Sequence, residues 1–286
     1  FALKAALLPL YLWLPAAYTH TSAPVAALFA IMTKVGAYSI LRVYTLMFGD
    51  GAGPVTGLLD AWLAPLALVT LALGTLGVVA STALRQQAAY LVVASIGSLL
   101  LAFGLGSAGA IAAGLYYLPH SVFAAGALFL LADTLGRARG PLADRFEPGP
   151  TMAGARVLGG LFFVVAIAIA GLPPLSGFLG KFMLLQAALD SPLLPWVWGV
   201  VLISGLVGMI ALARSGSLLF YRTHTSHDPA AQTPPTLAAL APVAGLLLLL
   251  IGMVIWAGPL SDYASATALQ LLQPQQYIGA VLRGTP

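Results

Sequence analysis

The sequence predicts an all-α polytopic membrane protein. Of its 286 residues, 60% are hydrophobic and only 7% are charged, and the mean hydropathy is +0.98. Soluble domains carry about 25% charged residues, so a soluble globular class is excluded. A transmembrane helix needs about 20 mostly apolar residues, which predicts a bundle of about eight such helices. The segments are 1–18, 23–48, 61–84, 87–105, 108–134, 155–187, 192–220 and 235–258.

The chain is expected to be one transmembrane domain over 1–286. It starts at Phe1, without a methionine and already inside an apolar run, so we interpret it as the C-terminal fragment of a longer subunit. The last stretch, 260–286, is less apolar and contains Pro274. We expect this tail to lie at the membrane interface.

Two apolar segments are interrupted. The interruptions are Pro9 and Pro15 in the block 1–48, and Gly171, Pro173, Pro174 and Gly177 in the block 155–187. Proline removes a helical hydrogen bond, and lipid cannot satisfy the freed backbone groups. Both breaks are therefore expected to face protein or water. The two segments are an odd number of crossings apart and traverse the membrane in opposite senses, which is typical of the inverted repeats of transporters.

All three lysines of the chain, Lys4, Lys34 and Lys181, fall inside apolar segments. A lysine at the centre of a bilayer costs about 2.5–3.5 kcal/mol on insertion scales, and such residues usually mark ion pathways. His120 follows Pro119 in another apolar segment and has a side chain suited to proton relay. The pattern predicts a proton-transfer route through Lys4, Lys34, His120 and Lys181.

Lys4 and His120 each have an alternative interpretation. A lysine close to a helix end can extend its ammonium group to the interface, which applies to Lys4 because it lies close to the start of the sequence. His120 can be a neutral histidine that is hydrogen-bonded to a neighbouring helix.

Other polar residues give weaker signals. His224 and His227, with Asp228, have the spacing of a metal pair, but their loop is polar and favours solvated side chains. Asp133 and Asp144 are expected to form a solvated charge cluster or to contact lipid headgroups. No cysteine, nucleotide-binding glycine motif or basic cluster with interleaved aromatics is present, so we expect no metal, no cofactor and no nucleic-acid partner.

Arginine distribution predicts the orientation. With alternating segments, one side carries Arg85, Arg137, Arg139, Arg145, Arg156, Arg214 and Arg222, whereas the other carries Arg42 and Arg283. The positive-inside rule places the arginine-rich loops in the cytoplasm and the C-terminus in the periplasm of a bacterial inner membrane.

Two stretches carry a family resemblance. KAALLPLYLWLPAAYTHTSAPVAALFAIMTKVGAYSILR and AGLPPLSGFLGKFMLL resemble the diagnostic blocks of the antiporter-like membrane subunits. These subunits belong to Mrp-type multisubunit cation/proton antiporters and to the proton-pumping arm of NADH–quinone oxidoreductase (complex I). The tail GPLSDYASATALQLLQPQQYIGAVL resembles the D-type subunit of the Mrp/Pha antiporters.

The resemblance implies the C-terminal part of a 14-helix fold and a role for each site residue. Lys4 matches the lysine of the broken seventh helix, which pairs with a glutamate that this sequence does not contain; Lys34 matches the lysine of the eighth helix. His120 matches the eleventh-helix histidine, and Lys181 the charged residue of the broken twelfth helix. The family often has a further lysine where this chain has Ala124, so at this step the implied relay is interrupted or passes to water.

The function implied is that of a membrane subunit of a monovalent cation (K⁺ or Na⁺)/proton antiporter, a secondary transporter and not an enzyme. Its partners would be other membrane subunits of a hetero-oligomeric complex, protons, monovalent cations and the lipid bilayer. The alternative is a proton-pumping membrane subunit of complex I or of a related membrane hydrogenase.

Overall fold

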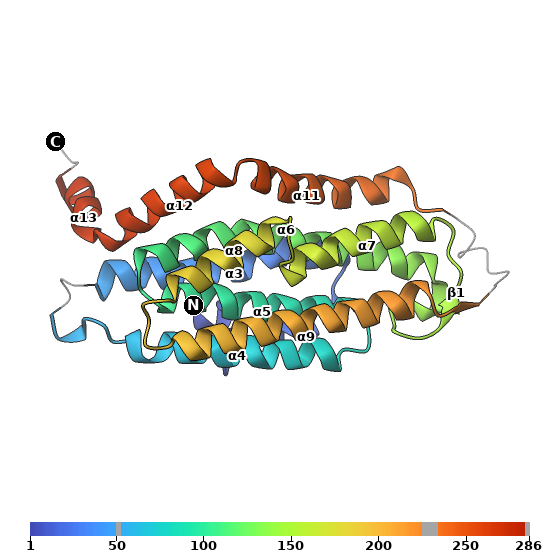
Figure 1. Cartoon of the computed structure of the whole chain (residues 1–286), viewed down its shortest axis with the longest axis horizontal. Helices are drawn as coiled ribbons and strands as arrows, with labels where there is room; N and C mark the ends of the chain where they lie inside the picture. The colour runs from blue at the N-terminus through green and yellow to red at the C-terminus, as the bar shows by residue number, and fades with distance from the viewer. Residues whose placement is uncertain (50–52, 225–233, 284–286) are drawn as a thin grey trace.

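The computed structural model describes residues 1–49, 53–224 and 234–283 and shows an elongated helical bundle (Figure 1). Within these residues, six helices are long and apolar enough to cross a membrane. They are α3 (Ala23–Met47), α4 (Asp60–Ala80), α5 (Leu84–Gly104), α6 (Ala108–Ala138), α9 (Leu194–Phe220) and α11 (Leu237–Ile255). The prediction of an all-α membrane protein is confirmed.

Two further apolar segments are each split into a pair of shorter helices. The first consists of α1 (Ala2–Ala5) and α2 (Trp13–His20), and the second of α7 (Ala155–Ala170) and α8 (Ser176–Ala187). In Figure 1 the second pair runs from the right end of the bundle to the left, whereas the first pair runs in the opposite direction. The two broken segments thus have the opposite senses expected from the sequence.

Two of the predicted helix-break residues are not in a break. Pro15 lies in the first turn of α2, where the missing N–H of a proline costs no helical hydrogen bond. Gly177 is the second residue of α8 and is buried. The breaks themselves comprise residues 6–12, which include Pro9, and residues 171–175, which include Gly171, Pro173 and Pro174.

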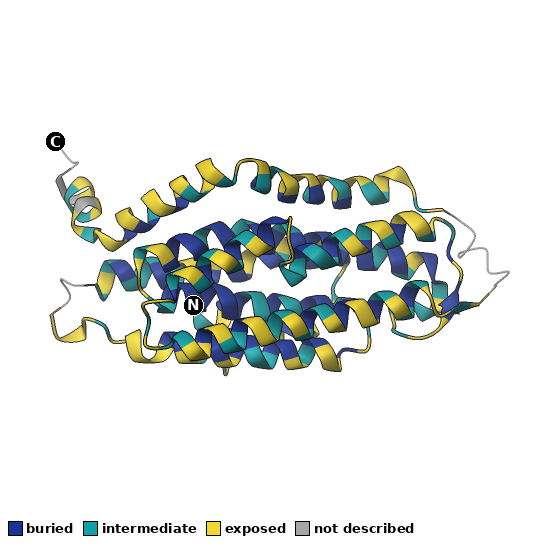
Figure 2. Ribbon diagram, in the orientation of Figure 1, coloured by how far each residue is buried: buried dark blue, intermediate teal, exposed yellow. Residues whose placement is uncertain are grey.

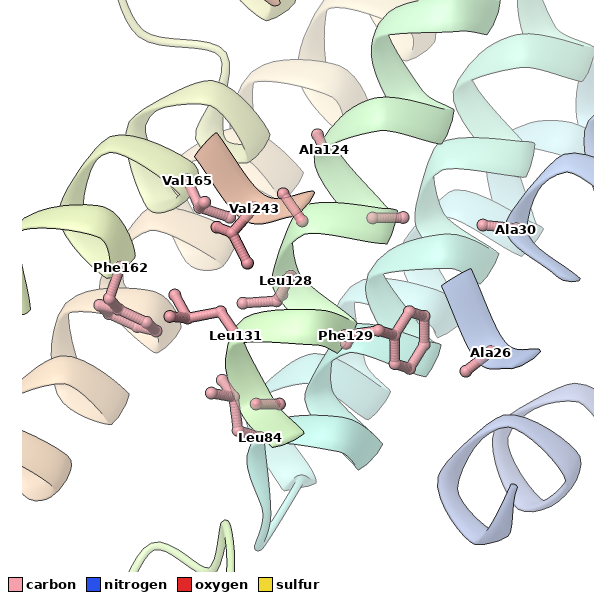
Figure 3. Close-up of a cluster of buried hydrophobic side chains, with 14 of the residues drawn as sticks. Ala26, Ala30, Leu84, Ala124, Leu128, Phe129, Leu131, Phe162, Val165 and Val243 are labelled. Carbon is pink, nitrogen blue, oxygen red and sulfur yellow. The ribbon is translucent and has the colours of Figure 1, made fainter. Parts of the chain in front are cut away.

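Helix α6 is the centre of the bundle. Leu128, Phe129 and Leu131 of α6 are each 0% exposed, and they face side chains from α3, α5, α7 and α11 (Figure 3). Helix α5 is buried to a similar degree, whereas α9 and α11 expose broad apolar faces (Figure 2). A helix that is apolar on all sides and buried on all sides is expected in the middle of a membrane bundle.

The C-terminal segment continues past α11 as α12 (Ala257–Leu272) and α13 (Pro274–Arg283). Helices α11 and α12 together follow one side of the bundle, and α12 packs against α6 and α3 (Figure 1). The hydroxyl of Tyr116 donates to the Met253 carbonyl at 3.0 Å and ties this side to α6. The position of 260–286 at a membrane interface remains a prediction.

At the right end of Figure 1, the described loop residues 139–154 and 222–224 contact each other and form a cap. It contains the 3₁₀ turn η2 (Gly140–Leu142) and the strand β1 (Gly149–Pro150), which pairs in parallel with β2 (Thr223–His224). A second 3₁₀ turn, η1 (Gly53–Val55), lies at the opposite end. Arg139 is only 1% exposed and donates to the carbonyls of Ala143, Arg145 and Glu147. Burial lowers the pKa of Arg139 from its ordinary value.

Asp133, near the end of α6, and Asp144, in the cap, both contact Arg85, so the predicted charge cluster is present but only partly exposed to solvent. Asp133 pairs with Arg85 at 2.5 Å and with Arg137 at 2.9 Å, and its side chain is 22% exposed. Asp144 accepts the backbone N–H of Arg85 at 2.6 Å, at the start of α5. A carboxylate at a helix N-terminus satisfies a backbone donor that has no partner within the helix.

Candidate proton-transfer site

The break between α7 and α8 is closed by Lys181. Helix α7 ends at Ala170, and Gly171 adopts a positive φ of 75°, a conformation that glycine tolerates best. The Nζ atom of Lys181 donates to the carbonyl of Ala170 at 2.8 Å and lies 3.5 Å from that of Ile169. The C-terminal end of a helix carries partial negative charge, so the freed carbonyls of α7 form a favourable place for a lysine.

His120 contacts the same break from α6. Its Nδ1 atom lies 2.9 Å from the hydroxyl of Ser176, the first residue of α8, and both side chains are buried. A Cβ atom at Gly177 would lie 2.7 Å from Nε2 of His120 and 2.3 Å from the carbonyl oxygen of Ala168. Position 177 is therefore restricted to glycine by the close approach of α6 and α7.

Lys34 is a buried residue of α3 that faces α5. It is 1% exposed, and its Nζ atom donates to the hydroxyl of Ser95 on α5 at 3.0 Å. Ser95 in turn donates to the Val92 carbonyl at 2.7 Å. The lysine ammonium therefore has a neutral partner, and no carboxylate of the described residues pairs with it.

A cavity joins these groups. It measures about 60 Å³ as space open to the centre of a water-sized sphere, and Ser95, Ser98, Tyr117, His120 and Lys181 all line it. A water needs about 10–15 Å³ by this measure, so the cavity has room for several waters. Ser95 connects it to Lys34. His120 and Lys181 thus line one cavity between the helices, which is mostly apolar with a few polar groups, and Lys34 contacts it through Ser95.

Lys4 is not part of this arrangement. It lies in the last turn of α1 with an exposed side chain and makes no hydrogen bond or ion pair to another described residue. Its backbone nevertheless packs against α3 near Lys34, because a Cβ at Gly36 would lie 3.0 Å from the Lys4 carbonyl carbon and 2.7 Å from Ala5 N.

The first break is closed by neutral groups. The N–H of Leu8 donates to the hydroxyl of Thr70 on α4 at 3.1 Å. The indole N–H of Trp13 donates to the Leu3 carbonyl at 3.0 Å. The first contact satisfies an N–H group that the interrupted helix leaves without a partner, and the second adds to the Ala6 N–H that the Leu3 carbonyl already accepts.

The candidate metal pair His224 and His227 lies only partly within the described residues. His224 is exposed at the end of β2, and His227 and Asp228 lie outside the described residues. Over 1–49, 53–224 and 234–283, no group of three or more His, Asp or Glu side chains could hold a metal ion.

The sequence pattern did not identify the neutral partners Ser95, Ser98, Tyr117 and Ser176. Ser95 and Ser98 are three residues apart in an otherwise apolar segment, which places them on one face of a helix. That spacing is a usable signal for a polar face directed at the lysines. Ser176 has no comparable signal, because its partner His120 lies on a different helix.

Fold and site together define a polytopic helical membrane protein with two oppositely directed broken helices, one of which, α7–α8, borders a cavity lined by His120 and Lys181. Residues 1–209 match the family described as NADH:quinone oxidoreductase/Mrp antiporter, TM (transmembrane), and the chain belongs to this family. The resemblance seen in the sequence is thereby confirmed.

Named relatives point to one branch of the family. The chain is 37% identical over 310 residues to the D-type subunit of a probable K⁺/H⁺ antiporter of Rhizobium meliloti (strain 1021), an alignment that covers 99% of this chain and 57% of the relative. It is 35% identical over 286 residues to the D-type subunit of a Na⁺/H⁺ antiporter of Bacillus subtilis (strain 168), covering 99% and 56%. The chain therefore spans just over half the length of these relatives.

A solved structure supports the fold. A chain of the Mrp complex from Dietzia sp. DQ12-45-1b superposes with a TM-score of 0.83, at 24% identity, over 98% of this chain and 59% of that chain. The bundle with its two broken helices is thus a known architecture.

Proposed function

We propose that this chain forms the proton-conducting part of a D-type subunit of a monovalent cation/proton antiporter. The names of the relatives support this class, with K⁺ or Na⁺ as the exchanged cation. The observation that carries the proposal is the cavity that connects His120 and Lys181 with Ser95, the partner of Lys34. Transport of this kind needs no covalent chemistry, so the subunit acts as a secondary transporter and not as an enzyme.

The relay that we propose runs through Lys34, His120 and Lys181, with water in the cavity between them. Each lysine is held by neutral oxygens, so its proton can leave without the loss of a strong ion pair. Lys4 would extend the route by pairing with an acidic residue from outside this sequence. Its exposed side chain at the end of α1 is compatible with such a pairing.

The surroundings follow from the same proposal. The subunit would lie in a bacterial inner membrane among other membrane subunits of a hetero-oligomeric complex. The loops around 81–83 and 139–154 meet at one end of the bundle, where Ala83 pairs with Arg145 and Gly149 N donates to the Arg222 carbonyl. We place this arginine-rich end in the cytoplasm and the C-terminus in the periplasm.

The test is antiport by the full-length subunit within its complex. Lys34→Ala and Lys181→Ala are each expected to abolish cation-induced proton exchange in dye-quench assays on membrane vesicles, with normal assembly. Arg156→Ala, an exposed cation outside the cavity, is the control and should retain activity. Full activity of both lysine variants would overturn the proposal.

The second candidate is a proton-pumping subunit of a NADH–quinone oxidoreductase or a related membrane hydrogenase. The family that this chain matches supports this second candidate, because the family includes membrane subunits of NADH:quinone oxidoreductases as well as of Mrp antiporters. Purification of the full-length subunit separates the two. Flavin and iron–sulfur subunits in the same complex would favour the redox enzyme, whereas small membrane subunits alone would favour the antiporter.

A further inference from the structure

A second cavity lies between α4, α5 and α9, towards the arginine-rich end of the bundle. It measures about 230 Å³ by the same measure as the central cavity. Its polar lining is contributed by Ser81, Gln87, Arg214 and Ser215. Ser81 follows the last residue of α4, and Arg214 is exposed in the last two turns of α9. The cavity therefore reaches the level where the helices end.

A buried glutamine–serine pair forms part of this cavity. Gln87 and Ser215 are each 2% exposed. The hydroxyl of Ser215 has two acceptors, Oε1 of Gln87 at 2.9 Å and the Ala211 carbonyl at 2.8 Å. A hydroxyl carries one proton. When that proton turns to Ala211, the amide oxygen of Gln87 is free to accept a hydrogen bond from water.

The pair stands in the wall between the two cavities. Gln87 and Ala211 line the second cavity, and the residues that follow them in the chain, Ala88 and Leu212, line the central one. Nε2 of Gln87 is 3.5 Å from the carbonyl of Val78, which also lines the central cavity. That long contact is weak, so a water molecule can replace the carbonyl as its partner.

We propose that Gln87 and Ser215 are positioning residues that hold water in a connection between the central cavity and the arginine-rich end. The inference rests on the proposed function, since the connection would let protons pass between the lysine–histidine site and the arginine-rich end. In the transfer, each water molecule accepts a proton from one neighbour and releases a different proton to the next neighbour. Gln87 and Ser215 donate and accept hydrogen bonds and end with the protons they began with.

The test uses the full-length subunit in its complex, in vesicles. Gln87→Leu keeps the side-chain size and removes its polar atoms, and it is expected to slow antiport about tenfold or more, as is Ser215→Ala. Gln86→Leu is the matched control, because Gln86 accepts from Thr82 outside both cavities. It should stay within about twofold of the parent.

Antiport measured in D₂O distinguishes a water connection from a structural defect. If proton delivery becomes limiting, the solvent isotope effect of Gln87→Leu and Ser215→Ala rises above that of the parent. Unchanged rates, or slower rates with an unchanged isotope effect, would overturn the inference. Active Gln87→Leu beside inactive Lys34→Ala and Lys181→Ala would refute this inference alone, whereas active lysine variants would refute the proposed function and this inference with it.

Discussion

The two broken helices solve the same physical problem with different residues. At the α7–α8 break, the freed carbonyl of Ala170 binds the ammonium of Lys181, and Ser176 binds His120. At the α1–α2 break, the Leu8 N–H binds the hydroxyl of Thr70 and the Leu3 carbonyl accepts from the indole of Trp13, both of them neutral side chains. One break thus gathers titratable groups inside the bundle, whereas the other is closed without any.

The difference shows that a break alone does not make a proton site. Lys4 precedes its break and lies on the exposed side of α1, whereas Lys181 follows its break and folds back onto the end of α7. A lysine positioned after the break can reach the partially negative C-terminus of the preceding half-helix. The position of the lysine relative to the break therefore decides whether the break becomes part of the cavity.

Gly177→Ala is the change expected to disturb the charged break most. The new methyl group would lie 2.3 Å from the Ala168 oxygen and 2.7 Å from Nε2 of His120, so α8 or the imidazole must move. Overpacking of this kind costs about 1–3 kcal/mol. A displacement near 1 Å at a transfer site can cost about 100-fold in rate. We expect antiport per assembled complex to fall by that order in vesicle assays.

Gly160→Ala is the matched control for this glycine. Gly160 lies in α7, and a Cβ there would meet nothing within 4 Å. Alanine is the better helix former by about 1 kcal/mol, so this variant should assemble normally and transport at the parental rate. Equal activity of the alanine variants at 177 and 160 would show that the close approach at His120 is dispensable.

Ser176→Ala tests the neutral partner of His120 with a smaller expected effect. The change removes one hydrogen bond to Nδ1 and leaves the backbone of α8 unchanged. A neutral hydrogen bond contributes about 0.5–1.5 kcal/mol net, which corresponds to a rate loss of up to about tenfold. Antiport in vesicles should fall to that extent, while Ser39→Ala, at a partly exposed serine of α3 whose hydroxyl donates to the Val35 carbonyl, should have no effect. A parental rate for Ser176→Ala would mean that this hydrogen bond is not needed to position His120.

The sequence predicts the membrane class, the two breaks and three of the residues around the cavity because each depends on a local pattern. Apolar segment length identifies the helices, proline and glycine identify the interruptions, and Lys34 or Lys181 stands out as a charge where lipid would not accept it. The assignment of Pro15 and Gly177 to the breaks is wrong. Proline is also common in the first turn of a helix, and glycine is also found where two helices approach closely, and these are the positions of Pro15 and Gly177.

The neutral partners could not be derived in the same way. Ser95 and Ser176 lie far along the chain from the residues they bind, and hydroxyl groups are common in helices for local reasons. Lys4 lies in the last turn of α1, and its side chain points outward. This direction depends on the exact end of α1, which only the folded backbone defines. Pairings between distant helices are set by packing, and a single sequence does not contain them.

Thr70→Val tests the neutral break and should separate stability from transport. Thr70 is 0% exposed, and its hydroxyl is the acceptor for Leu8 N–H. Valine keeps the shape and leaves that amide without a partner, which costs about 1–3 kcal/mol. The apparent melting temperature of the purified complex should fall by a few degrees, and Thr70→Ser, which keeps the oxygen, should restore it. Because no titratable group depends on Thr70, antiport per assembled complex should change by less than about twofold; a larger loss would show that both breaks take part in proton transfer.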